Sequence, residues 1–197
     1  MSKANISENG NLSVRHVVFC NNPLRRVNYF EGQVLGTDDF HAEQEYHRNK
    51  QRRHNLYCHG VGVVQGLQVS TTKENAHWSV VVEAGVAIDA IGNEVQLCTA
   101  AKFPLPETLT RIQVGIRFSE HLRGSVPVGD APSGESDTMP TRVEEGCEII
   151  LEPLLSARSI AAHVAGKAST DVLPLARVTR RKYAWQFDRR FKVSHAR

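Results

Sequence analysis

The stretch that decides the fold is TDDFHAEQEYHRNKQRRHNLYCHGVGVVQGLQV, residues 37–69. Its first part predicts a helix over about 38–57, because Thr37 and the acidic residues after it are typical of a helix start. Acidic side chains fill the first half and basic ones the second, an order that complements the helix dipole. Gly60 then ends the helix in a left-handed conformation.

Beyond the helix the pattern becomes that of a β domain. Gly62 and Gly66 interrupt an apolar run over 61–69, which predicts a strand with bulges or close backbone approaches. Residues 86–97 predict a β-hairpin in which Gly92-Asn93 supplies the positive φ values of the turn. Further strands are expected over 78–82, 111–118, 142–151 and 174–178.

These segments predict an α+β, mainly β protein with one long, polar N-terminal helix. The core is expected to be an antiparallel sandwich or barrel-like arrangement within a single domain, residues 14–176. A flexible leader over 1–13 precedes it, and a basic, aromatic C-terminal arm over 177–197 follows it. Residues 121–141, rich in Gly, Pro, Ser and Asp, predict a long loop. Residues 154–164 have helical composition.

Composition limits the possible classes of protein. The chain has 197 residues, 41% hydrophobic and 23% charged, which is typical of one globular domain with or without appendages. A chain of this length can form a core without disulfides or metals. The formal net charge of +3 is too small to indicate a nucleic-acid-binding protein by itself.

The cysteines and the N-terminus give expectations about the compartment. Cys20, Cys58, Cys98 and Cys147 lie far apart and form no CxxC motif, which argues against a zinc ribbon or a thioredoxin-type site. Residues 1–11 are polar and do not resemble a signal peptide, and no stretch approaches the roughly 18 apolar residues of a membrane helix. We expect synthesis in a reducing cytoplasm, with export by another route left open.

The helix raises the question of a metal site. The candidate ligands on the helix and at its end are His41, Glu43, Glu45, His47, His54, Cys58 and His59. Only the i,i+4 pairs Glu43–His47 and His54–Cys58 could each offer two ligands together, and neither forms HExxH. A solvated, charged helix face is favoured, and a metal-dependent enzyme that uses His54 and Cys58 stays an alternative.

Other catalytic motifs are missing from the sequence. The spacing of Gly60, Gly62 and Gly66 differs from GxGxxG, and the order is helix then strand, so these glycines are expected to be structural. No GxSxG occurs. We expect no catalytic residue, no cofactor and no bound metal, and a protein that is not an enzyme.

The C-terminal arm combines eight Lys or Arg with one acidic residue, Asp188. The candidate partner-binding residues are Arg180, Arg181, Tyr183, Trp185, Phe187, Arg189, Arg190 and Phe191. The alternation of its aromatic residues favours strand addition to a neighbouring subunit's sheet. Binding of single-stranded nucleic acid, which we consider a weaker hypothesis, and an inert solvated tail are the alternatives.

Residues 29–69 carry a longer pattern, YFxGQxLxxxDFxxEQxY followed by a basic stretch and HNxxxHGxGVVxGLxV. Residues 85–94 add GxAIDxxGNE. This pattern resembles that of small proteins of contractile injection systems, which are phage-tail-like particles and their relatives. A weaker likeness exists to the N-terminal domain of the baseplate subunit that links baseplate and membrane complex in type VI secretion.

The resemblance implies a structural subunit, in the baseplate or at a fibre or spike attachment point, within a virion or an injection system. Its partners would be other tail or baseplate subunits, and it would be a homo-oligomer or occur in multiple copies. The helix-to-core motif would be Tyr29, Phe30, Gly32, Leu35, Phe40, Gln44, Tyr46, Gly60, Gly62 and Gly66. Its large apolar members would anchor the helix to the β core, and the last three glycines would permit close backbone packing. A receptor- or glycan-binding fibre adaptor, with 121–141 as its contact surface, is the alternative.

Overall fold

The computed structural model describes the following residues: 3–6, 12–15, 23–127, 138–154, 172–182 and 184–197. They belong to two compact units, Met1–Lys50 and Gln51–Arg197, each of which is considered by itself. The boundary falls within the helix α1 (Thr37–Cys58), which is one residue longer at each end than the sequence predicts.

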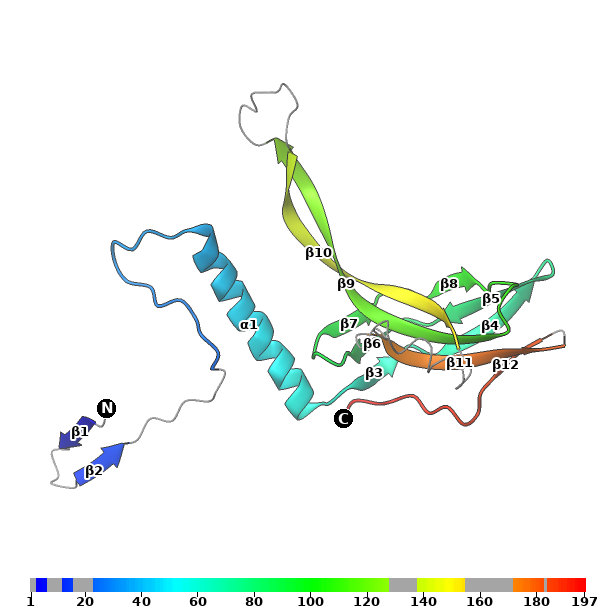
Figure 1. Ribbon diagram of the computed structural model, residues 1–197, viewed down its shortest axis with the longest axis horizontal. Coiled ribbons are helices and arrows are strands. Elements are labelled where there is room, and N and C mark those ends of the chain that lie inside the picture. Colours follow the sequence, from blue (N-terminus) through cyan, green and yellow to red (C-terminus); the bar gives the residue numbers. More distant parts are fainter. Residues whose placement is uncertain (1–2, 7–11, 16–22, 128–137, 155–171, 183) are drawn as a thin grey trace, which may run out of the picture. The chain divides into compact units, whose positions relative to one another are not determined.

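Strands make up most of the described chain (Figure 1). They are β1 (Lys3–Ile6), β2 (Leu12–Arg15), β3 (Gly62–Gly66), β4 (Val69–Glu74), β5 (His77–Val82), β6 (Gly85–Ile88), β7 (Glu94–Leu97), β8 (Ala101–Pro104), β9 (Arg111–Pro127), β10 (Thr138–Pro153), β11 (Leu173–Arg181) and β12 (Ala184–Phe187). The predicted α+β, mainly β class is confirmed. Within the described residues, no helix is long and apolar enough to cross a membrane.

The Met1–Lys50 unit contains a two-stranded antiparallel sheet and the first part of α1. Strands β1 and β2 pair with Ile6 opposite Leu12, so part of the segment expected to be a flexible leader over 1–13 is strand. The helix start is closed by Asp39, whose carboxylate accepts the Gly36 N–H at 2.9 Å. This back-hydrogen bond satisfies a donor that the helix itself leaves free.

The Gln51–Arg197 unit contains three antiparallel sheets around one core. Their strand orders are β10-β9-β11-β12, β3-β6-β7 and β4-β5-β8. Strand β9 shows why the core forms: Ile112, Val114 and Ile116 are fully buried, while the residues between them face the other side of the sheet. The alternation predicted over 111–118 is therefore confirmed for its apolar positions, which are buried. The predicted hairpin over 86–97 is present as the antiparallel pair β6–β7.

The predicted loop over 121–141 is wrong at both ends. Strand β9 continues to Pro127 and β10 begins at Thr138, so the two form one long hairpin. The polar, Gly-rich composition hides the strands because this part of the hairpin has no buried face. Residues 128–137 lie outside the described part of the chain.

The C-terminal segment is not a separate arm over 177–187. Strand β11 crosses the predicted boundary and pairs with β9, and β12 pairs with β11. The period-two pattern therefore places Trp185, only 6% exposed, in this chain's own core. Further on, the Val63 N–H donates to the Ser194 carbonyl at 2.8 Å, and Ala196 N–H donates to the Val63 carbonyl at 3.1 Å. Nearly all of the helical segment predicted over 154–164 lies outside the described residues.

Replacing Ile112 by alanine tests the core. We expect the free energy of unfolding to fall by about 2–5 kcal/mol, because a fully buried side chain leaves a cavity. The matched control is Ile91→Ala, since that side chain is 53% exposed, and its effect is expected within about 0.5 kcal/mol. Urea denaturation followed by circular dichroism measures both; equal losses would contradict this core.

Candidate functional site

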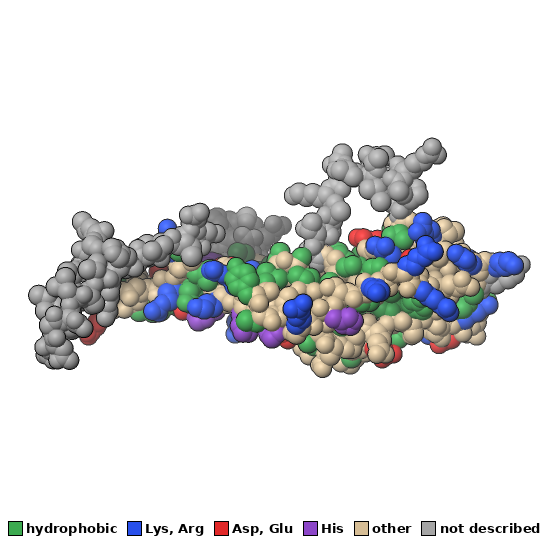
Figure 2. Space-filling view, turned by 90° about the horizontal axis from the view of Figure 1, so that it is seen from below, with side chains coloured by type: hydrophobic (Ala, Val, Ile, Leu, Met, Phe, Trp, Pro, Cys, Tyr) green, Lys and Arg blue, Asp and Glu red, His purple; other side chains and the backbone are tan. Residues whose placement is uncertain are grey.

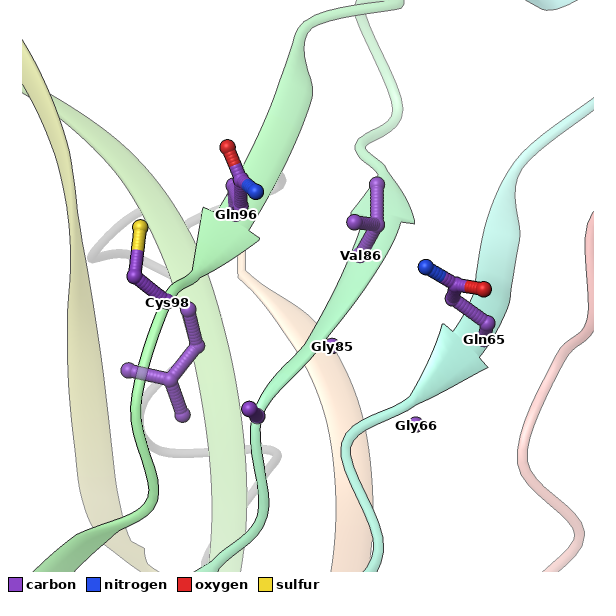
Figure 3. Close-up of a pocket in the computed structure, with 8 residues that line it drawn as sticks. Gln65, Gly66, Gly85, Val86, Gln96 and Cys98 are labelled. Carbon is purple, nitrogen blue, oxygen red and sulfur yellow. The ribbon is translucent and has the colours of Figure 1, made fainter.

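Strands β3, β6 and β7 border a hollow of about 370 Å³ (Figure 3). Its side chains come from Gln65 on β3, Val86 on β6, and Gln96 and Cys98 at the end of β7. Neutral amides and one thiol can donate and accept hydrogen bonds, but they bring together no nucleophile and base. The hollow therefore offers no catalytic arrangement.

The turn between β6 and β7 is built around a buried carboxylate. Asp89 is 1% exposed. Its Oδ1 accepts the backbone N–H groups of Ile91, at 3.0 Å, and Asn93, at 2.8 Å. Its Oδ2 accepts the Asn93 side-chain amide at 2.7 Å. These three hydrogen bonds fix the turn and orient the Asn93 amide.

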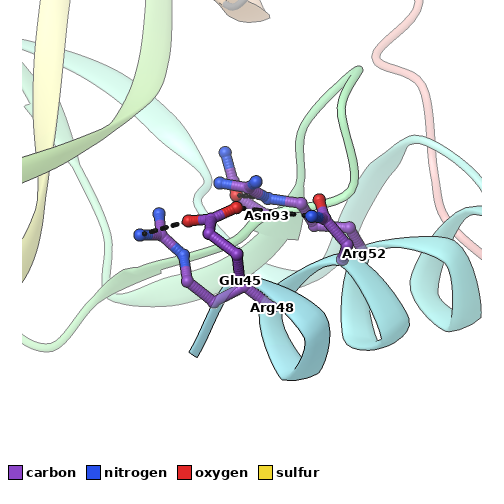
Figure 4. Close-up of polar contacts among 5 residues, drawn as sticks. Glu45, Arg48, Arg52 and Asn93 are labelled. Carbon is purple, nitrogen blue, oxygen red and sulfur yellow. Dashed lines mark hydrogen bonds and ion pairs between the residues drawn. The ribbon is translucent and has the colours of Figure 1, made fainter. Parts of the chain in front are cut away.

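The oriented turn holds the last part of α1. The Nε of Arg52 donates to Asn93 Oδ1 at 2.7 Å (Figure 4). The Nδ2 of Asn55, which is 5% exposed, donates to the Gly92 carbonyl at 2.9 Å. Gly92 has φ +93°, and a Cβ there would overlap the Arg52 carbonyl. We call Arg52, Asn55, Asp89, Gly92 and Asn93 the helix–turn junction.

The turn departs from one detail of the sequence prediction. Gly92 has the positive φ that the hairpin needs, whereas Asn93 does not have one. Asn93 is instead held by its own backbone and side-chain hydrogen bonds to Asp89. A side chain that accepts nearby backbone N–H groups can close a turn without a second left-handed residue.

The glycines after the helix lie at close backbone approaches. Gly60 has φ +78° at the end of α1. A Cβ on Gly62 would come within 2.6 Å of the Ser194 carbonyl group, and one on Gly66 would overlap the Ala84 carbonyl oxygen. Gly62 therefore lets the C-terminal segment run beside β3. Gly66 lets the end of β3 pair closely with the start of β6, where it stands opposite Gly85.

The large apolar residues expected to anchor the helix do not belong to the core. Four of them are exposed: Tyr29 (53%), Phe30 (66%), Leu35 (39%) and Phe40 (54%). Tyr46 is half-buried and Gln44 is exposed. The one buried residue of α1 is Asn55, which lies in the Gln51–Arg197 unit, and anchoring of the helix by those four side chains stays a prediction.

The possible metal ligands form pairs only. Glu43 Oε1 lies 3.0 Å from His47 Nε2, and His54 Nδ1 lies 3.6 Å from Cys58 Sγ. Among the described residues, no group of three or more His, Cys, Asp or Glu side chains could hold a metal ion. In the Met1–Lys50 unit, Glu45 pairs instead with Arg48 at 3.4 Å (Figure 4).

The candidate partner-binding residues separate into three groups. Trp185 is in the core, and the Phe191 ring lies 4.8 Å from the Arg177 guanidinium. Arg180 donates to the Glu107 carbonyl at 2.9 Å. The remaining described members line one hollow: Arg181, Phe187, Arg189 and Arg190. Tyr183 lies outside the described residues.

Four of the five junction residues stand in the motifs HNxxxHG and AIDxxGNE, and Arg52 lies two positions before the first motif; neither motif by itself predicts that these residues meet. The sequence signal for this turn is Asp89, which stands two and four residues before the backbone N–H groups that donate to it. Such spacing is typical of a side chain that caps a turn.

No protein-family model and no curated protein matches the chain. Solved structures with a partial likeness to the chain include the following two. The crystal structure of TssK has a TM-score of 0.48 at 13% identity, covering 84% of this chain and 41% of that chain. The cryo-electron-microscopy structure of the type VI secretion system TssK-TssF-TssG baseplate subcomplex has a TM-score of 0.48 at 11% identity, covering 86% of this chain and 62% of that chain. The chain thus spans less than two thirds of either matched chain.

Cys147 differs from the other described thiols in its burial. Cys58 and Cys98 are exposed, and all three are free cysteines; Cys20 lies outside the described residues. Burial raises the pKa of the Cys147 thiol, and the charge of nearby Cys98 raises it further. Since only the thiolate reacts with alkylating reagents, Cys147 should be the slowest of the three.

Alkylation with iodoacetamide, followed by mass spectrometry of peptides, measures this order. We expect the Cys147 rate to be still rising with pH above 9.0, its ordinary pKa, because its thiolate forms only at higher pH. Cys58 is the exposed control. A Cys147 rate that equals the Cys58 rate and levels off below that pH would contradict the burial.

Replacing Asp89 by alanine tests the helix–turn junction. We expect a loss of about 1–3 kcal/mol in the free energy of unfolding, because partly buried N–H groups lose their acceptor. The control is Asp188→Ala, since that carboxylate accepts the Arg190 N–H at 3.0 Å in an exposed setting. Denaturant unfolding of both variants measures the difference. If both variants lower the free energy of unfolding by a similar, small amount, the Asp89 carboxylate does not organise the turn.

Proposed function

We propose that this protein is a structural subunit of a contractile, phage-tail-like injection particle. It lies in the baseplate or at a fibre or spike attachment point and acts through assembly with neighbouring protein subunits. The observation that carries the proposal is an apolar face on the outer part of the β9–β10 hairpin. The sequence pattern over residues 29–94 supports the choice of particle by resemblance.

The outer part of this hairpin, residues 119–127 and 138–146, is called the projecting hairpin (Figure 1). On one face Leu122 stands opposite Val143, and Val126 stands opposite Met139. Their exposed fractions are 68%, 57%, 45% and 58%. Four large apolar side chains thus share one solvent-exposed face.

The opposite face of the projecting hairpin is polar. Arg123 Nε donates to Glu144 Oε2 at 3.2 Å, and both side chains are 64% exposed. Arg142 stands opposite Arg123 in the register. The hairpin is therefore amphipathic, although neither face is covered by the rest of the described chain.

An uncovered amphipathic hairpin calls for a partner surface. Two strands without further cover are marginally stable in water. Fully burying one large apolar side chain stabilises a structure by about 1.5–3 kcal/mol, so four of them can contribute substantially to an interface. A neighbouring protein subunit with an apolar surface is the occupant that matches this face.

A second apolar surface lies in the Met1–Lys50 unit. Tyr29, Phe30, Val34 and Phe40 are all more than half exposed, with Val34 at 91%. These residues belong to the extended segment before α1 and to its first turn. Exposed aromatic residues are enriched at protein–protein interfaces, so this segment is a further candidate contact with neighbouring subunits.

Replacing Leu122 and Val143 by serine tests the proposal. We expect the double variant to enter sedimentable particles of the native host at least tenfold less than the unchanged chain, because the apolar contact is lost. Quantitative mass spectrometry of purified particles measures incorporation. The control is Arg123→Ser with Glu144→Ser on the polar face, which should enter normally.

Two outcomes would contradict the proposal. One is an unchanged chain that stays soluble and never sediments with sheathed particles. The other is a Leu122→Ser, Val143→Ser variant that assembles normally but no longer binds the target cell, which would favour a fibre adaptor. Circular dichroism of both double variants excludes misfolding as the cause.

A further inference from the structure

A groove of about 950 Å³ lies against the end of the β9-β11-β12 sheet. Arg111, Thr179 and Gln186 stand in one register row across the three strands. The basic groove, as we call it, is lined by Arg111, Thr179, Arg181, Gln186, Phe187, Asp188, Arg189 and Arg190. On the face that Figure 2 shows, Lys and Arg side chains gather over this part of the sheet.

The charge of the groove is not compensated within the described chain. Its four arginines are Arg111, Arg181, Arg189 and Arg190, and no described carboxylate forms an ion pair with any of them. The one carboxylate among the lining residues belongs to Asp188, and it accepts the backbone N–H of Arg190 at 3.0 Å, not its guanidinium group. The whole chain carries a net charge of only +3, so this concentration of positive charge is local.

Neighbouring arginines are held in fixed places, in contrast to those four. Arg177 Nε donates to Gln113 Oε1 at 3.1 Å, and its guanidinium stacks on the Phe191 ring. Arg180 donates to the Glu107 carbonyl. The structure thus uses two arginines to tie the segment after β12 and the β8–β9 connection to the sheet. It leaves the four groove arginines available.

We propose that the basic groove binds an extended acidic segment of a neighbouring protein subunit. This inference rests on the proposed assembly function and names the chemistry of one partner. Among the described strands, β12 is the last in the order β10-β9-β11-β12, so in this part of the chain it has a hydrogen-bonded neighbour on one side only. An extended segment can add to such an edge through its backbone, while its carboxylates reach the guanidinium groups.

The described aromatic residues of this region favour a peptide over nucleic acid. Single-stranded nucleic acid needs exposed rings on which successive bases stack. Trp185 is 6% exposed in the core, and the Phe191 ring is engaged by Arg177. Phe187, at 40% exposure, is the one described ring that the groove offers. One ring is too few for a stacking surface but can contact an apolar side chain of a peptide.

The test uses the full chain and a fluorescein-labelled peptide of alternating Glu and Thr, followed by fluorescence anisotropy in about 50 mM salt. We expect saturable binding that weakens as salt rises, since exposed charges are screened. The double variant R189Q/R190Q should bind at least tenfold more weakly. The matched control R123Q/R142Q removes the same charge from the projecting hairpin and should bind normally.

Three results would overturn the proposal. They are no binding of the acidic peptide, an equal loss in the control variant, or tighter binding of single-stranded DNA that also depends on Arg189 and Arg190. The readout is independent of particle assembly. Peptide binding by a chain that never sediments with particles would reject the proposed function and leave the groove assignment standing. A chain that assembles into particles but does not bind the peptide would reject the groove assignment and leave the proposed function standing.

Discussion

The buried carboxylate of Asp89 is the interaction on which the junction between helix and sheet depends. By accepting two backbone N–H groups and the Asn93 amide, it reinforces a turn that is also closed by backbone hydrogen bonds from Asp89 N–H to the Asn93 carbonyl and from Gly92 N–H to the Asp89 carbonyl. The fixed turn presents one side-chain oxygen to Arg52 and one carbonyl to Asn55. A buried carboxylate is tolerated in such a place because its oxygens are satisfied.

Docking through polar groups has a consequence for the rest of the surface. A helix that packs by an apolar stripe uses that stripe for its own core. Here the part of α1 in the Gln51–Arg197 unit buries Asn55, and Gly92 brings the turn against the helix backbone, so this part docks mainly through polar groups. In the Met1–Lys50 unit Phe30 and Phe40 are more than half exposed, and under the proposed function they are candidate contacts with neighbouring subunits.

The sequence was most informative where a physical pattern had a single cause. The alternation of β9 follows from one buried face, so residues 111–118 could be predicted, as could the helix from its charge order. Most of the projecting hairpin, residues 119–127 and 138–141, could not, because strands exposed on both faces have the polar, Gly-rich composition of a loop. Trp185 was misjudged for a different reason: a period-two pattern indicates a strand but not whose sheet it joins. The helix–turn junction needed the approach of residues 37 or more positions apart.

The four-stranded sheet offers two unlike surfaces, and this difference carries physical meaning. The projecting hairpin presents apolar side chains, whose burial contributes affinity without strong directional preference. The basic groove at the β11–β12 end presents guanidinium groups, which contribute association rate, register and discrimination between partners more than affinity. Under the proposed function, joining a particle in one orientation would use both kinds of contact, on a body rigid enough to keep them apart. The fully buried row Ile112, Val114 and Ile116 lies on β9, the strand that runs from the basic groove into the projecting hairpin, and so provides that rigidity.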